Sequence, residues 1–326
     1  MTLDDIARLI RQSRSPKELF EKTSHRDILM ACHPDRNPGE PRAEALFKQV
    51  QDLHKQSEQP PVVVKSPQRK YTLLKTIAAG DVSDVFLAES DGKDYVFKIS
   101  RVPEGRGLLQ AEGVTLKTLN AKADGLTYRH YLPTLVESFP ANTRFVNVFE
   151  HQGGFHTLEE VHEKYPKGVE PGHLGWIFNR LLTVLGFARL HNFVHGAVLP
   201  NHVLLHTEDH GLRLVGWGQG VTPGNKVLFA STKYRNWYAP EVVRKLPASP
   251  ETDIYHAVKC LLYVSGGDPV NNCWPYVVPK QMRHFFNSCL LEGAGLRPGD
   301  AWALMEEYRE LLLNTFGTPK FLSLPM

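Results

Sequence analysis

Histidine side chains gather in one part of the chain, within HNFVHGAVLPNHVLLHTEDH. Imidazole nitrogens can bind transition metals, so such a stretch could serve a metal centre. Zinc sites, however, combine convergent ligands at defined spacings, which these histidines do not show. We therefore interpret them as packed structural residues and expect no metal. They are His191, His195, His202, His206 and His210.

The overall composition excludes several classes of protein. A formal net charge of +3 over 326 residues is too small to indicate nucleic acid binding. The N-terminal MTLDDIARLI is acidic where an export signal is basic, and Arg180 and Arg189 interrupt the most apolar helical stretch, so we expect neither export nor a membrane span. The cysteines show no paired spacing, which predicts buried, reduced thiols in a cytoplasmic protein. They are Cys32, Cys260, Cys273 and Cys289.

The elements around this stretch fall into two regions joined by a proline-bearing segment. Prolines in QSEQPPVVVKSPQRK oppose helix and favour extended backbone, so residues 58–70 are predicted to be a linker. Helical patterns precede it within residues 1–57, and alternating strand patterns followed by helices come after it. The sequence therefore predicts an α+β chain with a small helical segment at its N-terminal end.

A second group of polar residues lies between the two helical patterns of residues 1–57, in CHPDRNPGEPRAE. The flanking helices are expected to pack as an antiparallel hairpin. Because Pro34 fixes its own φ angle, the loop should be stiff and should present His33 and Asp35 to a partner. The alternative is a plain helical hairpin whose loop is merely polar.

This loop resembles the His-Pro-Asp signature of J domains. HRDILMACHPD is similar to the second helix of that family, with Arg26 at its basic position, and AEALFKQVQDLH is similar to the third helix, with Phe47 as its core aromatic residue. The resemblance implies that His33, Pro34, Asp35 and Arg26 engage a DnaK-type chaperone and stimulate its ATP hydrolysis.

The strand pattern after the linker, YTLLKTIAAGDVSDVFLAESDGKDYVFKIS, predicts an antiparallel sheet. It resembles the start of a protein kinase. Gly80 and Val85 match the loop that covers the phosphates, Lys98 matches the strand lysine that contacts them, and Glu112 matches the glutamate that pairs with this lysine. Phe149 matches the gatekeeper position. The resemblance makes ATP the one cofactor that these residues could bind.

The C-terminal half carries the structural positions of the same family in order. His195 and Pro200 match the catalytic loop, Glu241 matches the Ala-Pro-Glu motif, and Asp253 matches the anchoring aspartate of the following helix. Arg297 matches the arginine that pairs with this glutamate. The resemblance implies a two-lobed protein kinase-like fold, with an N-lobe at residues 71–150, a C-lobe at 151–326 and a J-domain-like hairpin at 1–57.

The catalytic positions of that family are occupied by other residue types. Ala197 replaces the catalytic aspartate, Leu199 replaces the catalytic-loop lysine, and His202 and Gly216 replace the two metal ligands. Magnesium requires oxygen ligands, and a methyl group cannot orient a hydroxyl, so we predict a pseudokinase without catalytic residues. Its expected function is that of a scaffold or adaptor for a protein client or signalling partner, and for a DnaK-type chaperone.

Two alternatives remain open at this point. One is an atypical active kinase in which oxygen ligands come from elsewhere, and the other is a nucleotide-sensing switch that binds ATP through Lys98 and Glu112. The relocated ligands of the first alternative would be Asn201, Glu208, Asp209 or Asn225.

Overall fold

A computed structural model describes residues 1–103 and 105–326. The chain divides into two compact units, each built from two segments. Unit 1 holds Met1–Pro103 and Phe139–His151, and unit 2 holds Glu104–Ser138 and Gln152–Met326. The sequence pattern instead assigns residues 71–150 and 151–326 to successive lobes. Helix α5 (Pro103–Lys122) therefore belongs almost entirely to the unit that contains the catalytic-loop region.

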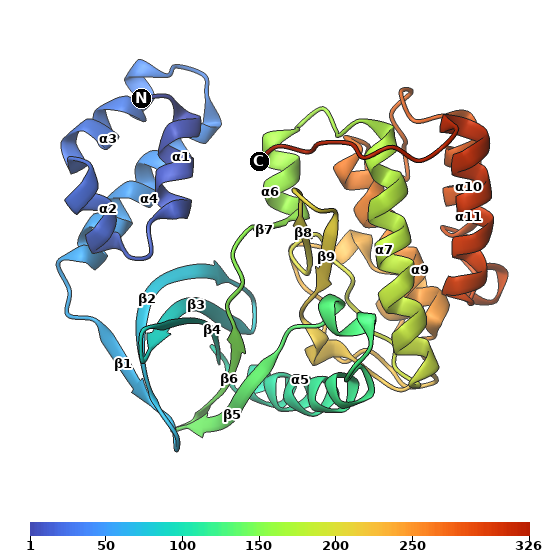
Figure 1. Ribbon diagram of the computed structural model, residues 1–326, viewed down its shortest axis with the longest axis horizontal. Coiled ribbons are helices and arrows are strands. Elements are labelled where there is room, and N and C mark those ends of the chain that lie inside the picture. Colours follow the sequence, from blue (N-terminus) through green and yellow to red (C-terminus); the bar gives the residue numbers. More distant parts are fainter. The chain divides into compact units, whose positions relative to one another are not determined.

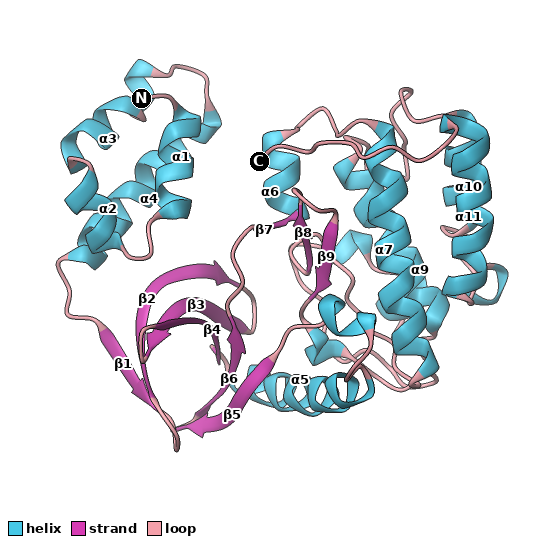
Figure 2. Ribbon diagram, in the orientation of Figure 1, coloured by secondary structure: helices cyan, strands magenta, loops and turns pink.

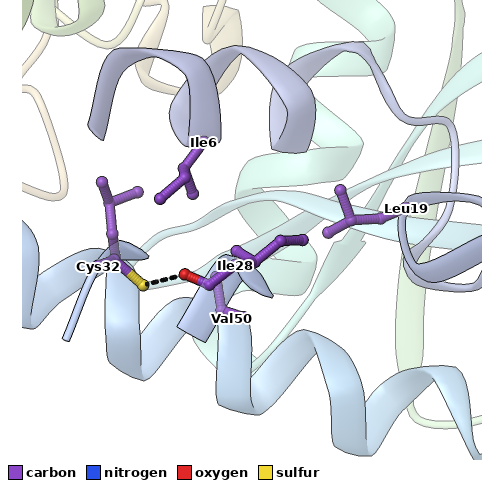
Figure 3. Packing of buried hydrophobic residues seen from close by; sticks show 6 residues of the cluster. Ile6, Leu19, Ile28, Cys32 and Val50 are labelled. Atoms are coloured by element: carbon purple, nitrogen blue, oxygen red, sulfur yellow. Dashed lines mark hydrogen bonds between the residues drawn. The ribbon is translucent and has the colours of Figure 1, made fainter. Parts of the chain in front are cut away.

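Unit 1 begins with helices that enclose a small core of their own. They are α1 (Leu3–Gln12), α2 (Pro16–Lys22), α3 (His25–Ala31) and α4 (Pro41–Ser57), with a 3-10 turn at Pro34–Arg36 (Figure 1). Thr2 and Asp5 form a capping box at the start of α1, and Pro16 occupies the first turn of α2, where its missing N–H costs nothing. Figure 3 shows the buried side chains that meet between these helices. The core comprises Ile6, Leu19, Ile28, Cys32, Leu46 and Val50.

The predicted helical hairpin was therefore incomplete. Helix α1, which the prediction lacked, adds Ile6 to the core, whereas the break that the pattern indicates at KTSH, residues 22–25, is confirmed: it separates α2 from α3. The division falls at Thr23 and Ser24, whose backbone is not helical. Leu3, Ile6 and Ile10 recur at helical spacing, so the pattern for α1 was present in the sequence.

The strands of unit 1 form the antiparallel sheet that the alternating pattern predicted (Figure 2). The strand order is β1-β2-β3-β4-β6-β5. Strand β1 lies within residues 58–70, which the sequence pattern marks as a linker, and it pairs with β2. The strands are β1 (Val62–Lys65), β2 (Lys70–Ala79), β3 (Ser83–Ser90), β4 (Lys93–Ser100), β6 (Arg144–Glu150) and β5 (Leu135–Ala141), of which residues 135–138 are assigned to unit 2.

Polar contacts attach the N-terminal helices of unit 1 to this sheet. The Lys75 ammonium of β2 donates to the carbonyls of Ile10, Arg11 and Ser13 at 3.3, 2.8 and 2.5 Å. These carbonyls lie at the C-terminal end of α1, where they lack helical partners and attract positive charge. Nearby, the Arg14 guanidinium contacts both carboxylate oxygens of Asp94 at 2.5 and 3.2 Å. The helices are thus fixed to β2 and β4 by side chains as well as by the connecting segment.

Unit 2 is mainly helical and is organised around α7 (Pro171–Leu190), the long buried helix that the sequence predicted. Helix α7 packs against α9 (Pro250–Val264) and α11 (Ala301–Phe316) (Figure 1). At Gly186 an added Cβ would lie 2.1 Å from the indole of Trp302, so glycine permits this close packing. The other elements are the 3-10 helices at Thr127–Tyr131, Trp217–Gln219, Arg235–Trp237 and Ala294–Leu296, the strands β7 (Phe155–Thr157), β8 (Val203–His206) and β9 (Gly211–Leu214), and the helices α6 (Leu158–Lys164), α8 (Pro240–Val243), α9 (Pro250–Val264), α10 (Lys280–Ser288) and α11 (Ala301–Phe316).

The cysteine prediction holds at three positions and fails at one. Cys32, Cys260 and Cys289 are buried, whereas Cys273 is exposed in the loop that follows α9. All four are free thiols, so the prediction of reduced cysteines agrees with the structure. Across the described chain, no helix is both long enough and apolar enough to cross a membrane.

Candidate functional site

One buried carboxylate anchors the loop between α7 and β8. Asp253 of α9 accepts hydrogen bonds from the backbone N–H groups of His195 and Gly196, at 2.6 and 2.8 Å. Burial raises the pKa of Asp253 to about 7, although these two N–H groups favour its charged form. Gly196 has a φ of +75° and an added Cβ there would lie 2.9 Å from Val227, so only glycine fits this turn well.

The His195 ring links the loop to the segment after β9. Its Nδ1 accepts from the Ala197 N–H at 3.3 Å, so Nε2 carries the proton and donates to the Val215 carbonyl at 3.0 Å. The Trp217 ring meets the His195 ring edge to face at 4.6 Å. Trp217 is fully buried, and its Nε1 donates to the Leu214 carbonyl at 2.8 Å. Trp217 is thus part of the core of unit 2.

His202 and Gly216 lie against each other in this region. The His202 Nδ1 donates to the Ala197 carbonyl at 2.8 Å, which fixes the position of the ring. A Cβ added at Gly216 would lie 2.8 Å from three atoms of that ring. The φ of Gly216 is +83°, a conformation that also favours glycine. The imidazole therefore fills the volume into which a side chain at position 216 would extend.

Two other catalytic positions of the kinase pattern, 197 and 199, hold buried apolar side chains. Ala197 and Leu199 are only 1% and 2% exposed, so their apolar side chains belong to the interior. Among the described residues, no group of histidine, cysteine and acidic side chains could hold a metal ion. Asp209, one of the relocated ligands considered above, is occupied in the turn after β8 by the Gly211 N–H and the His206 ring, both at 2.8 Å.

Glu241 and Arg297 are brought together as a buried ion pair. Two guanidinium nitrogens of Arg297 lie 2.8 and 3.1 Å from the two carboxylate oxygens of Glu241, and Thr252 also donates to this carboxylate at 2.7 Å. Burial alone would raise the pKa of Glu241, but the Arg297 and Thr252 hydrogen bonds hold it below its ordinary value. The pair joins the start of α8 to the segment before α11.

The residues considered for nucleotide binding are divided between the units. Val85 and Lys98 are cross-strand partners on β3 and β4 of unit 1, and Gly80 precedes β3, where its N–H donates to the Ser83 carbonyl at 2.9 Å. Phe149, the predicted gatekeeper, lies on β6 and is 6% exposed. Glu112 lies on α5 in unit 2 and is buried.

The His-Pro-Asp loop is ordered by its own contacts. The His33 Nδ1 accepts from the Asp35 N–H at 3.2 Å, and the His33 ring meets Phe47 edge to face at 5.1 Å. The Asp35 side chain is 89% exposed. Arg26 is also exposed, on α3, whereas Pro34 is half-buried at the start of the turn. The loop therefore holds the His33 ring in place, while the Asp35 carboxylate faces solvent.

In the sequence, His202 and Gly216 are two separate departures from the kinase pattern. The structure shows that one side chain fills the space left by the other. It also shows the role of His256, which the sequence did not single out: its Nε2 accepts from the Ala239 N–H at 3.0 Å in the core. A histidine inside the apolar pattern of α9 was the available signal.

Comparisons with known proteins place this geometry in a wider context. No family model matches the chain. The chain is 22% identical over 205 residues to a probable serine/threonine-protein kinase, mkcC, of Dictyostelium discoideum, a match that covers 61% of this chain and 21% of that protein. It is 27% identical over 180 residues to the cyclin-dependent kinase-like 4 protein of Mus musculus, covering 53% of this chain and 50% of the relative.

A solved structure shows the same fold. The crystal structure of the PF14_0431 kinase domain aligns with a TM-score of 0.57 at 15% identity, and covers 73% of this chain and 94% of that chain. The chain therefore contains a protein kinase-like domain with a two-lobed fold of helices and an antiparallel sheet, preceded by a helical segment. The matched region spans at most half of the two curated relatives.

Proposed function

We propose that the kinase-like domain is a pseudokinase that acts as a protein scaffold. The observation that carries this proposal is the contact between His202 and Gly216. Phosphoryl transfer needs metal ions to neutralise the charge of the phosphates and a carboxylate to orient the attacking hydroxyl. At the corresponding positions this chain has an imidazole packed over a glycine and, in Ala197, a buried methyl group.

The structural contacts that the fold retains favour a scaffold. A domain without any function would have been expected to lose these contacts as well as its catalytic residues. Asp253 still anchors the loop through two hydrogen bonds, and Glu241 still pairs with Arg297. These groups position the chain without taking part in phosphoryl transfer. A domain that keeps them has a defined surface, which is what a protein client or signalling partner requires.

The N-terminal helices have a second role in the proposal, which is to recruit a DnaK-type chaperone to whatever the kinase-like domain binds. Support comes from the exposed Asp35 carboxylate, from the contacts that order His33, and from the exposed Arg26 on the neighbouring helix. Placing two binding functions on one chain raises the local concentration of one partner near the other.

Catalysis is tested by incubating the purified full chain with radiolabelled ATP and magnesium, with Lys98→Met as the matched variant. We expect no transfer to the chain itself or to a generic protein substrate, because the metal ligands and the carboxylate are missing. Magnesium-dependent transfer that Lys98→Met abolishes would refute the pseudokinase assignment and favour the atypical kinase.

Chaperone recruitment is tested by the steady-state ATPase rate of a DnaK-type chaperone with increasing amounts of the full chain. We expect saturable stimulation that His33→Gln and Asp35→Asn remove. The control is Lys48→Gln, which changes an exposed residue of α4 outside the loop. An unchanged ATPase rate at saturation, or stimulation by both loop variants equal to that of the native chain, would exclude this role.

A nucleotide-sensing switch is the second candidate, favoured by one observation. Val85 and Lys98 face each other on adjacent strands, so an apolar side chain and an ammonium lie side by side. The test is thermal unfolding of the full chain with ATP, with and without magnesium. A rise in the unfolding temperature that Lys98→Met removes would support the switch, and no rise under either condition would exclude it.

A further inference from the structure

Unit 2 contains a small open pocket that uses none of the residues discussed so far. Its volume is about 280 Å³, and it lies between the loop after α9 and the helix α10. This volume is slightly below the roughly 300–1,000 Å³ that is typical for drug-sized ligands, so the pocket suits a small polar group. It is lined by Asn272, Trp274, Lys280, Arg283, His284 and Asn287.

The orientation of the two asparagine carboxamides in the pocket is fixed by hydrogen bonds to their oxygens. The Trp274 Nε1 donates to the Asn287 Oδ1 at 2.9 Å, and the Lys259 ammonium donates to the Asn272 Oδ1. An indole N–H and an ammonium have no acceptor capacity, so these contacts fix which end of each carboxamide is the oxygen. The NH₂ group of each asparagine is the end left to serve a ligand.

The cations of the pocket have no partner of opposite charge in the part of the chain that the structure describes. No acidic residue occurs in the sequence between Asp268 and Glu292. The Asp268 carboxylate is already occupied by the N–H groups of Val270 and Asn271, and Glu292 pairs with Arg244. The segment that forms the pocket, residues 272–287, therefore supplies cations and no carboxylate.

Arg283 shows this lack of a partner most clearly. Its Nε is buried without a hydrogen-bond partner among the described residues, so a ligand in the pocket would meet the two outer guanidinium nitrogens. Its guanidinium lies 5.5 Å from the centre of the Tyr276 ring, which restricts its orientation. A guanidinium held in this way is suited to a planar or tetrahedral oxyanion.

We propose that this pocket binds the phosphoryl group of a phosphorylated protein segment. The lysine, the arginine and the asparagine NH₂ groups that line the pocket are hydrogen-bond donors, and a phosphate monoester offers three strong acceptor oxygens with a charge of about −1.5 to −2. The proposal is independent of the pseudokinase and chaperone assignments, because it shares no residue with them.

A peptide carrier fits the surroundings of the pocket better than a lipid surface does. Tyr276 and Val277, in the same loop, are 91% and 61% exposed, and give apolar contacts for side chains next to a phosphorylated residue. Lys280, Arg283 and His284 provide fewer cations than the roughly four to eight lysines and arginines of a lipid-binding cluster.

The test is fluorescence polarisation of the full chain with a labelled acetyl-Ala-Leu-phosphoSer-Leu-Ala peptide and its unphosphorylated counterpart. We expect saturable binding of the phosphorylated peptide only. Arg283→Gln and Lys280→Gln should each weaken it about ten-fold or more, as expected for the loss of a charge-assisted hydrogen bond. Lys280 is exposed, so its variant keeps the test valid if Arg283→Gln unfolds. The control Arg309→Gln, an exposed cation on α11, should leave binding unchanged.

Three outcomes would overturn the proposal. The first is no binding of the phosphorylated peptide, or binding that Arg309→Gln weakens as much as Lys280→Gln does. The second is displacement of the labelled peptide by inorganic phosphate at the same concentration at which the unlabelled phosphopeptide displaces it. This result would make the ligand a free anion. The third is binding to phosphatidylserine vesicles, in the absence of peptide binding, that Lys280→Gln removes, which would make the partner a membrane.

Discussion

Adding a single methyl group at position 216 tests the feature on which the proposed function depends. Gly216→Ala requires a non-glycine residue at a φ of +83° and puts a Cβ at 2.8 Å from the His202 ring. The left-handed conformation costs about 1–2 kcal/mol, and overpacking a filled interior costs about 1–3 kcal/mol more. We expect Gly216→Ala to lower the free energy of unfolding by about 2–5 kcal/mol.

Gly224→Ala is a matched control that separates the two contributions. Gly224 has a φ of +91°, but an added Cβ there has no neighbour within 4 Å. Its substitution should therefore cost only the conformational part, about 1–2 kcal/mol. The difference between the two alanine variants measures the contact with His202.

A double-mutant cycle identifies His202 as the cause of that difference. In a His202→Ala background the space beside position 216 is open, so Gly216→Ala should cost no more than Gly224→Ala does. The coupling energy between positions 202 and 216 should then be about 1–3 kcal/mol. The measurement is urea unfolding of the full chain at 25 °C, followed by far-ultraviolet circular dichroism. Equal costs for Gly216→Ala in both backgrounds, or equal costs at positions 216 and 224, would refute the packing argument.

The remaining predictions concern the core of unit 2 and the attachment of the N-terminal helices. Arg297→Leu leaves the Glu241 carboxylate buried without its partner and should cost about 3–5 kcal/mol in thermal unfolding. Burial lowers the pKa of His256 to about 3, whereas its ordinary value is 6.5, so protonation of the unfolded chain should remove about 2 kcal/mol of stability between pH 7.5 and 5. His256→Gln should lose that pH dependence. Lys75→Met should speed proteolysis of α1 several-fold, whereas Lys70→Met on the same strand should not.

These three predictions can fail in distinct ways. Arg244→Leu removes an exposed ion pair and should cost less than about 1 kcal/mol, so an equal loss for Arg297→Leu would contradict the role given to burial. A His256→Gln variant with the same pH dependence as the native chain would assign that dependence to other groups. Equal protease sensitivity of the two lysine variants would show that Lys75 does not hold α1.

Much of the fold could be predicted from local patterns in the sequence. Alternation of apolar residues predicted the antiparallel strands, and the apolar run of α7 predicted a buried helix, because both patterns reflect burial directly. The pairing of Glu241 with Arg297 could be expected only through resemblance to a known family. Their separation along the chain carries no signal that local periodicity can detect.

The features that were missed depend on contacts between distant side chains. The sequence shows that His202 and Gly216 differ from the family pattern, but not that the imidazole fills the space beside the glycine. The phosphate pocket was missed for a similar reason, since the role of Asn272 depends on a hydrogen bond from Lys259. Helix α1 was not predicted although its apolar spacing is present, because it is short and Ile6 is its one buried residue.

The contacts of Lys75 and Arg14 with the N-terminal helices change how a recruited chaperone would be carried. A segment joined only by a flexible linker sweeps a volume, and the encounter of its two partners depends on linker length. Because side chains attach the N-terminal helices to β2 and β4, these helices keep a fixed orientation relative to the sheet. That orientation sets the direction from which a partner approaches the sheet. Lengthening the connection between α4 and β1 should then change the orientation of these helices less than removing the contacts of Lys75 and Arg14 does.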